Sequence, residues 1–502
     1  LAMRPRSFVP AALVLLGGAL AACAHSPAPV PATPAPAPAP AIDTTVPPPP
    51  TTPPTLGPPP TLQLPPITTR RLANGMTLVI VEQHELPVAD FVLLVRTGGE
   101  ADPAGRGGLS SLTADMLDEG TTTRSALQVA DQEAFLGVEL GTGGGWDASQ
   151  VALHTTTAQL DSALALFADV ALHPSFPDSD FERVRKQHLT ELVQLKDRAP
   201  AIADRAFAAI VYGTRHPYGH ALAGTEPSMG AITRTDIRRF YDTYYRPNNA
   251  TMLVVGDITP DDAERRVTAL FSGWERRAVP PTTYGTAPRG TATTVYLIDK
   301  PGAAQSSFRI GGVGVPRSTS DYFALQVMNT ILGGAFTSRL NQNLRETHGY
   351  TYGAFSGFAM RREAGPFTAR AEVVAAKTDS ALVEFLRELR AIRDTVPAVE
   401  LEKAKRYLEL QLPGDFESTG DIARQLVPIV LYDLPLDFYD GYVRHIDGVS
   451  QGEVQRVARR YIEPDSLSVV IVGDRKAIEG RLRGLRVGPV SIRNMEGESI
   501  RP

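Results

Sequence analysis

The sequence contains almost no cysteine, because Cys23 is the only one among 502 residues. A single cysteine excludes an intramolecular disulfide and a zinc site built on several cysteines. No apolar run reaches the roughly 18–20 residues of a spanning helix, which excludes a multi-pass membrane protein. Neither sign of charge dominates, since 50 Lys and Arg face 55 Asp and Glu for a net charge of −5. Without a basic excess, we expect no nucleic-acid partner.

The N-terminal segment has the pattern of a secretory signal. A basic start precedes an apolar stretch at 9–20, and small residues lead to Cys23. Leu20–Cys23 resembles the bacterial lipobox, in which the cysteine is lipidated; the alternative is an ordinary signal peptide with a cysteine near the cut by chance. We expect a lipoprotein signal peptide at 1–23 and a lipid anchor at Cys23 as the only contact with the membrane. Ala24 in place of Asp favours a location in the bacterial cell envelope, at the outer membrane facing the periplasm.

A Pro- and Ala-rich stretch follows the anchor. Residues 24–66 hold 18 of the 42 prolines and too few apolar side chains to form a core. We expect a disordered, extended spacer that holds the folded body away from the bilayer, although a ligand for a peptide-binding module is the alternative.

From residue 67 onward the apolar pattern becomes that of strands and helices. Buried strands are predicted at Leu78–Val81 and Phe91–Val95, and helices at Leu160–Leu172 and Phe181–Leu195. A further helix begins after Ser125, with Gln128 completing a capping box. Its apolar residues recur at helical spacing along one face: Leu127, Ala130, Ala134, Phe135 and Val138.

The order of these elements repeats. Tyr245-Arg246-Pro247 leads to Gly256-Asp257, and Tyr461-Ile462-Glu463-Pro464 leads to Gly473-Asp474 at the same distance from the proline. The second half also begins with a predicted strand, Val295–Ile298, followed by a predicted helix, Phe323–Gly333. This order repeats that of the first half, where a strand precedes the predicted helix Leu109–Gly120. We therefore expect an α+β fold of two tandem homologous mixed α/β domains. Their predicted bounds are 67–276 and 291–486, with an inter-domain linker at 277–290 and a loose polar tail at 487–502.

Several motifs together resemble the insulinase/pitrilysin family of zinc peptidases, which includes the mitochondrial processing peptidases. The matching stretches are Leu72–Gly75, Gly107–Leu109 with Met116-Leu117 and Gly120-Thr121, His216–Gly219, Arg246–Ala250 before Val254–Asp257, Gly333–Asn341, and Leu344–Glu346 with Gly349–Gly353. The resemblance implies the metallohydrolase fold of the mitochondrial processing peptidases, in which such a chain forms half of a clamshell.

The chain departs from the family at the zinc motif. Active members carry H-x-x-E-H, whose histidines hold Zn²⁺ and whose Glu activates the metal-bound water. The aligned residues here are Ser111-Leu112-Thr113-Ala114-Asp115, and Glu191 aligns with the downstream ligand. One or two carboxylates are too few for a functional metal site, so we expect no metal in this chain. An exposed helix-face Asp is the simpler interpretation of Asp115.

The nine histidines do not rebuild a site elsewhere. His216 and His220 are four apart, but Pro217 and Gly219 between them argue against one helix face. His154 and His188 lie in predicted secondary structure, where core or surface roles are commoner than metal ligation.

Arg345 and Tyr352 match a pair that active members use across the chamber from the zinc. By the resemblance, they bind the substrate backbone and stabilise the developing oxyanion, for which a guanidinium and a phenol are suitable donors. The alternative is a solvated arginine and a strand tyrosine packed in the core, and Tyr350 is the residue most easily confused with Tyr352.

A retained pair without zinc ligands suggests a subunit of a two-subunit metallopeptidase. We expect this chain to be inactive alone and to bind unfolded peptide with a paralogue that carries H-x-x-E-H and the Zn. The alternative is a catalytically inactive scaffold or peptide-binding lipoprotein of the same fold, since fold alone does not grant activity. A standalone peptidase with an unusual metal site ranks below both.

Overall fold

The computed structural model describes Gly57 and residues 65–288 and 290–500. The chain divides into two units after Gly57, so that all other described residues belong to the second unit. The predicted signal peptide, Cys23 and most of the Pro-rich spacer lie outside the described residues. None of the described helices is long and apolar enough to cross a membrane.

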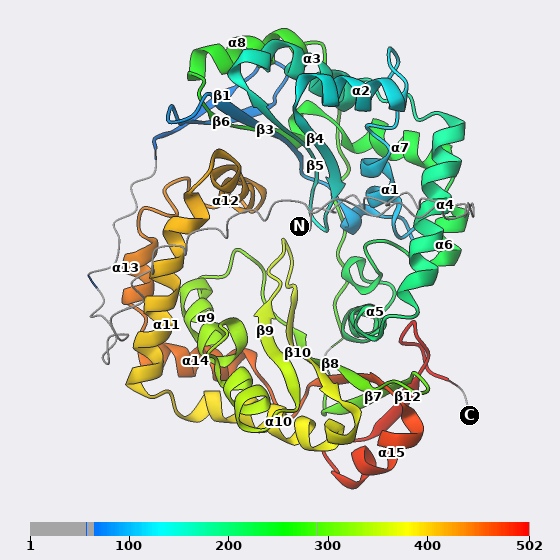
Figure 1. The fold of residues 1–502 in the computed structure, drawn as a ribbon, viewed down its shortest axis with the longest axis vertical. Helices are drawn as coiled ribbons and strands as arrows, with labels where there is room; N and C mark the ends of the chain where they lie inside the picture. The colour runs from blue at the N-terminus through cyan, green and yellow to red at the C-terminus, as the bar shows by residue number, and fades with distance from the viewer. Residues whose placement is uncertain (1–56, 58–64, 289, 501–502) are drawn as a thin grey trace, which may run out of the picture. The chain divides into compact units, whose positions relative to one another are not determined.

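Two six-stranded sheets form the framework of the second unit (Figure 1). The strands of the first sheet are β1 (Ile67–Arg71), β2 (Thr77–Glu82), β3 (Val88–Val95), β4 (Glu139–Gly144), β5 (Ser149–Thr156) and β6 (Ala250–Gly256). Those of the second sheet are β7 (Thr294–Asp299), β8 (Gln305–Val313), β9 (Thr351–Phe358), β10 (Pro366–Val374), β11 (Ser468–Gly473) and β12 (Val490–Arg493).

The strand orders confirm two similar halves. The first sheet runs β1-β2-β6-β3-β5-β4 and the second β12-β7-β11-β8-β10-β9. In both, the strand that ends in the repeated Gly-Asp pairs in parallel with a strand at the start of its half, β2 with β6 and β7 with β11. Gly256 has φ +144°, and a Cβ there would lie 2.3 Å from the carbonyl oxygen of Val88. Only glycine permits so close an approach of the two strands.

Helices cover both sheets. In the first half they are α1 (Leu109–Asp115), α2 (Ala126–Leu136), α3 (Leu160–Leu172), α4 (Asp178–Leu195), α5 (Ala199–Tyr212), α6 (Glu226–Ala231), α7 (Arg234–Tyr244) and α8 (Pro260–Phe271). In the second half they are α9 (Tyr322–Asn329), α10 (Thr378–Asp394), α11 (Ala398–Gln411), α12 (Thr419–Leu431), α13 (Tyr442–Asp447), α14 (Gln451–Tyr461) and α15 (Arg475–Gly484). Two π-helical stretches, Thr330–Gly334 and Asn341–Thr347, lie between α9 and β9.

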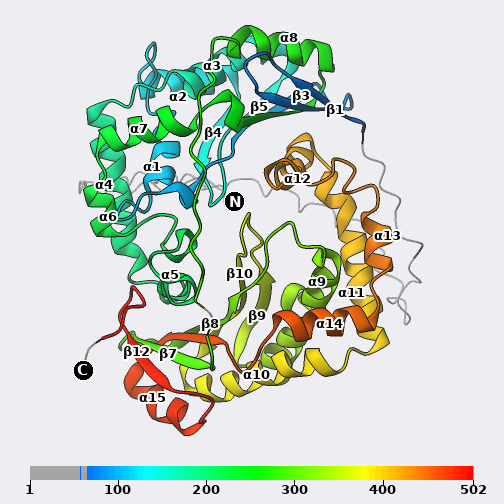
Figure 2. The same cartoon turned by 180° about the vertical axis from the view of Figure 1, so that it is seen from behind.

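Each half covers one face of the other half's sheet. Alternate strand residues point to opposite faces, so Leu78 and Ile80 face the core of the first half while Val79 and Val81 face the other way. That second face packs against α12, and the corresponding face of the second sheet packs against α5. Both views of the ribbon show α12 beside the first sheet and α5 beside the second (Figures 1 and 2). The two halves therefore share two of their hydrophobic cores.

We predict that shortening one buried side chain of α12 destabilises both halves. Leu426 is 2% exposed in the core beneath the first sheet, so Leu426→Ala should lower the free energy of unfolding by ~2–5 kcal/mol. Thermal and denaturant unfolding would measure the change, with the exposed Arg424→Ala on the same helix as control. Equal stability of the two variants would contradict a shared core.

Three elements differ from the sequence-based expectations. Helix α1 ends at Asp115, well before Gly120, and α9 passes into a π-helical turn instead of continuing as an α-helix to Gly333. The tail is not loose throughout, because Val490–Arg493 forms β12 and pairs in parallel with β7. Backbone pairing with the second sheet thus extends into the predicted tail.

The helix after Ser125 forms with its predicted capping box, but its apolar face is turned to solvent. Leu127 is 69% and Phe135 86% exposed, and Val129 is the one buried side chain of α2. The helix packs on α3 at the margin of the half, so only a narrow stripe of it meets the core.

Candidate functional site

Helix α1, which carries the aligned zinc motif, begins in a tight turn. Gly108 has φ +93°, and a Cβ there would lie 2.9 Å from the carbonyl oxygen of Ala223, so the position requires glycine. The first N–H groups of the helix are satisfied from outside the turn. The carboxylate of Asp102 accepts from the N–H of Gly108 at 2.7 Å and from that of Ser110 at 2.8 Å. Nothing in the sequence spacing indicated this cap.

The aligned motif positions do not fit zinc. Ser111 and Ala114 offer no metal ligand of the kind that zinc prefers, and Ala114 is completely buried. Asp115 is partly exposed, but its Oδ2 lies 3.0 Å from Nε2 of His188 on α4. Glu191, one turn further along α4, accepts from the side-chain amide of Gln187 at 3.3 Å.

The contact of Asp115 with His188 joins α1 to α4. The sequence did not indicate this partner, because His188 could be assigned only to predicted secondary structure. In the part of the chain that the structure describes, no three His, Cys, Asp or Glu side chains are grouped to hold a metal ion.

The other histidine pair is held apart by a short turn. Pro217–Gly219 forms one turn of 3₁₀-helix, so His216 and His220 do not share an α-helical face. Nδ1 of the buried His216 accepts from the N–H of Tyr218 at 3.0 Å, and burial lowers the pKa of both histidines. These side chains stabilise the loop.

Arg345 and Tyr352 lie on consecutive elements of the second half. Arg345 is in the π-helical stretch, where its guanidinium carbon lies 4.2 Å from the ring centroid of Phe336. Its Nη1 is 2.9 Å from a carboxylate oxygen of Glu346, but makes no hydrogen bond of good geometry. Tyr352 is the second residue of the edge strand β9 and is 91% exposed.

The exposure of Tyr352 excludes the alternative in which it packs in the core. Tyr350 is the packed one of the two tyrosines, with its ring stacked on His348 at 4.9 Å and its side chain against the second core. The structure thus separates two residues that the sequence could not.

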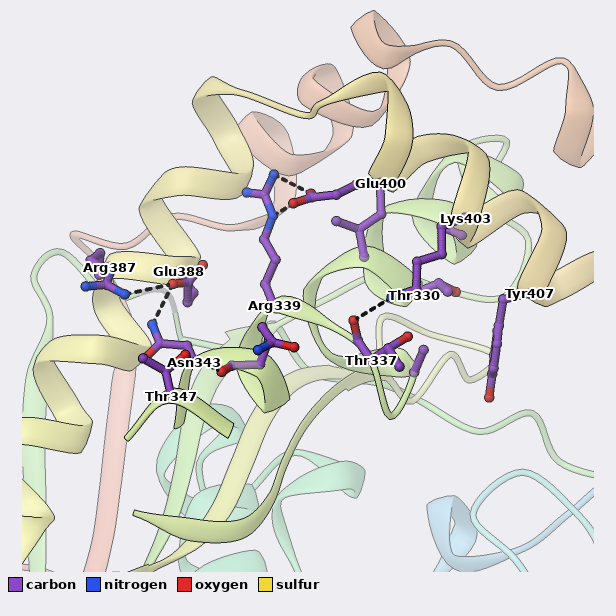
Figure 3. A pocket seen from close by; sticks show the side chains of 14 residues that line it. Thr330, Thr337, Arg339, Asn343, Thr347, Arg387, Glu388, Glu400, Lys403 and Tyr407 are labelled. Carbon is purple, nitrogen blue, oxygen red and sulfur yellow. Dashed lines mark hydrogen bonds and ion pairs between the residues drawn. The ribbon is translucent and has the colours of Figure 1, made fainter. Parts of the chain in front are cut away.

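A hollow of about 520 Å³ lies between the two π-helical stretches, α10 and α11 (Figure 3). Its charged side chains are mostly paired with one another. Arg339 contacts Glu400 at 2.7 Å, and the amide of Asn343 donates to Glu388 at 2.6 Å. Because these charges are already satisfied, the hollow offers little to a charged ligand.

A buried carboxyl near α1 predicts a dependence of stability on pH. Glu100 is 4% exposed and accepts from the N–H of Gly98 at 2.8 Å, and burial, aided by the charge of Asp147, raises its pKa from 4.5 to about 8. Because the folded state holds this proton more tightly than the unfolded chain, its stabilising contribution is complete below about pH 4.5 and falls as the pH rises to about 8.

Glu100→Gln should remove that fall, because the amide stays neutral. We expect a flatter plot of melting temperature against pH between about 5 and 8 than for the unaltered chain. The exposed Glu85→Gln serves as control. Parallel plots for all three proteins would show that Glu100 is not protonated in the folded state.

Family models match both halves of the chain. The insulinase family, peptidase family M16, matches residues 78–226, and the peptidase M16 inactive domain matches residues 231–408. The chain therefore belongs to peptidase family M16.

Its relatives include proteins named as peptidases and as non-peptidases. An "uncharacterized zinc protease" of Mycobacterium leprae is 28% identical over 299 residues, which are 59% of this chain and 66% of that protein. The "non-peptidase homolog" YmxG of Helicobacter pylori is 23% identical over 432 residues, 84% of this chain and 97% of that one. The crystal structure of a peptidase M16 inactive domain from Pseudomonas fluorescens superposes with a TM-score of 0.77 at 27% identity, over 81% of this chain and 98% of that one.

These similarities agree with the geometry at α1. The chain thus has an M16 fold that lacks H-x-x-E-H at residues 111–115, matches the family's inactive domain over residues 231–408 and is similar to a protein named a non-peptidase homologue.

Proposed function

We propose that this chain is the non-zinc-binding, substrate-binding subunit of a two-subunit metallopeptidase that hydrolyses unfolded peptides in the bacterial cell envelope. Its partner carries H-x-x-E-H and the Zn. The single observation that carries the proposal is the exposure of Tyr352, a large aromatic side chain presented to solvent at the start of an edge strand.

Packing does not account for that exposure. A phenol that is 91% exposed contributes little buried area, and its hydroxyl has no partner among the described residues. A hydroxyl placed in this way can donate to a carbonyl that arrives with a substrate. Arg345 stands on the preceding element, and π-helical turns such as the one that holds it are frequent at functional sites.

The cleanest test is peptidase activity in a reconstituted pair. The chain, the H-x-x-E-H paralogue and their mixture are each given an unstructured fluorogenic peptide. Activity that appears only in the mixture supports the proposal. A paralogue that is equally active without this chain would instead favour the scaffold, and zinc-dependent activity of this chain alone would contradict both.

The envelope location makes a separate prediction. If Cys23 carries the lipid, Cys23→Ser should move the protein from the membrane to the soluble fraction, because serine lacks the thiol that carries the acyl chain. Immunoblots of separated membrane and soluble fractions would show the shift, with Ser26→Ala as a control beside the anchor. Membrane retention of the Cys23→Ser protein would contradict the anchor without affecting the peptidase proposal.

A further inference from the structure

A second cavity lies between α4, α5, the loop at 220–224 and the turn that joins β9 to β10. Its volume is about 420 Å³, within the range of pockets that hold small ligands. Apolar side chains form much of its wall: Leu192, Ile202, Phe207 and Leu222. Arg361, from the second half, brings a positive charge into this apolar setting.

The guanidinium of Arg361 is held by rings and not by carboxylates. Its central carbon lies 4.3 Å from the ring centroid of Trp146 and 4.5 Å from that of Tyr218. Across the described residues, this guanidinium makes no ion pair and donates no hydrogen bond, and its Nη1 is fully buried. A buried donor without an acceptor is costly, and burial accordingly lowers the pKa of Arg361.

The nearby carboxylate of Asp147 is already committed. Its Oδ1 accepts from the hydroxyl of Tyr218 at 2.7 Å. Its Oδ2 accepts from the backbone N–H of Arg362 at 2.7 Å and from the hydroxyl of Tyr432 at 3.0 Å. These bonds fix the turn that carries Arg361. The charge of Asp147 favours the charged form of Arg361, but the two side chains make no ion pair among the described residues.

The other cations of the cavity have acidic partners. Lys196 lies 2.6 Å from Glu226, and Arg205 lies 3.1 Å from Glu496. Arg361 is thus the cation of this cavity without an acidic partner, and the donors left for a ligand are its Nε and Nη2, since Nη1 is enclosed.

We propose that this cavity binds an organic carboxylate with an apolar body. The carboxylate accepts from the guanidinium of Arg361, a pairing that suits the planar geometry of both groups. The apolar body lies against the wall formed by α4 and α5. The inference is independent of whether the chain pairs with a peptidase.

Isothermal titration of the full chain with matched probes tests this. The probes are N-acetyl-leucyl-leucine, its C-terminal amide and octanoate. A carboxylate should bind at least tenfold more tightly than the amide, because a charge-assisted hydrogen bond is about twice as strong as a neutral one. Arg361→Gln should abolish the preference, Arg361→Lys should retain part of it, and Arg387→Gln in the hollow of Figure 3 should change nothing.

A second variant separates binding from folding. Ala208→Trp leaves Arg361 in place but fills the cavity, so it should prevent binding of every probe while melting remains cooperative. Preference for the peptide acid over octanoate assigns a peptide C-terminus, and the reverse assigns a fatty acid. Binding of no acid, equal binding of acid and amide, or unchanged binding by Ala208→Trp would overturn the site.

Discussion

Tyr352→Phe should lower the turnover of the reconstituted peptidase about 10²–10³-fold, the loss expected when one donor to a developing oxyanion is removed. The substitution deletes only the hydroxyl. Because Tyr352 is 91% exposed and outside every described hydrophobic core, the thermal stability of the chain should not change. The measurement is kcat and KM of the mixture with the H-x-x-E-H paralogue.

Tyr350→Phe is the matched control. It removes the same hydroxyl two residues earlier, from a ring that stacks on His348 and packs against the second core. We expect turnover close to that of the unaltered mixture. Equal losses for the two variants, or no loss for either, would contradict the role assigned to Tyr352.

Arg345 should affect substrate binding more than turnover if it holds the peptide backbone. Phe336 and Glu346 flank its guanidinium, so Arg345→Lys keeps the charge but loses the planar donor set. A rise in KM with a smaller change in kcat identifies uniform binding of substrate and transition state.

Local patterns in the sequence were sufficient for the strands and for the duplication. The sequence predicts that Val79 and Ile80 are both buried, and both are. Ile80 lies in the core of the first half, whereas Val79 lies in the core that the first sheet shares with α12. The sequence could not indicate that α12, from the other half, covers Val79, because that contact depends on the tertiary arrangement. For the same reason the capping box of α2 was predicted correctly while the direction of Phe135 was not.

The candidate site likewise has features that local sequence shows and features that depend on the tertiary arrangement. The absence of H-x-x-E-H from Ser111–Asp115 is a local feature that can be read directly in the sequence. The contact of Asp115 with His188 joins two helices that lie far apart along the chain. Arg361 likewise lines its cavity only because the two halves pack together. The roles of Arg345 and Tyr352 stay predictions, with Tyr352 now known to be exposed.

Replacing Ser111 and Asp115 together by histidine should give the chain a zinc site that it lacks. The two positions are four residues apart within α1, so both side chains project from one face. Asp115 already reaches His188 at 3.0 Å, so an imidazole at position 115 would lie near a further nitrogen ligand on α4. Two imidazoles on α1 together with His188 would offer three nitrogen ligands, and zinc accepts three protein ligands with water in the fourth position.

We expect the double variant to bind Zn²⁺ with a Kd of about 1 µM or lower, ~8 kcal/mol of binding free energy. Titration calorimetry, the zinc retained after dialysis and a zinc-dependent rise in melting temperature would each report it. Asp115→His alone is the control and should bind zinc more weakly, because one ligand is missing.

The restored metal should not restore peptidase activity. Hydrolysis also needs a carboxylate base at position 114, where the completely buried Ala114 leaves no room for a longer side chain without repacking. A folded double variant that retains no zinc would show that α1 and α4 do not present their side chains to a common point. Zinc binding without hydrolysis would show that two separate features prevent catalysis. One is the missing zinc ligands, and the other is the buried Ala114, which stands where the carboxylate base is needed.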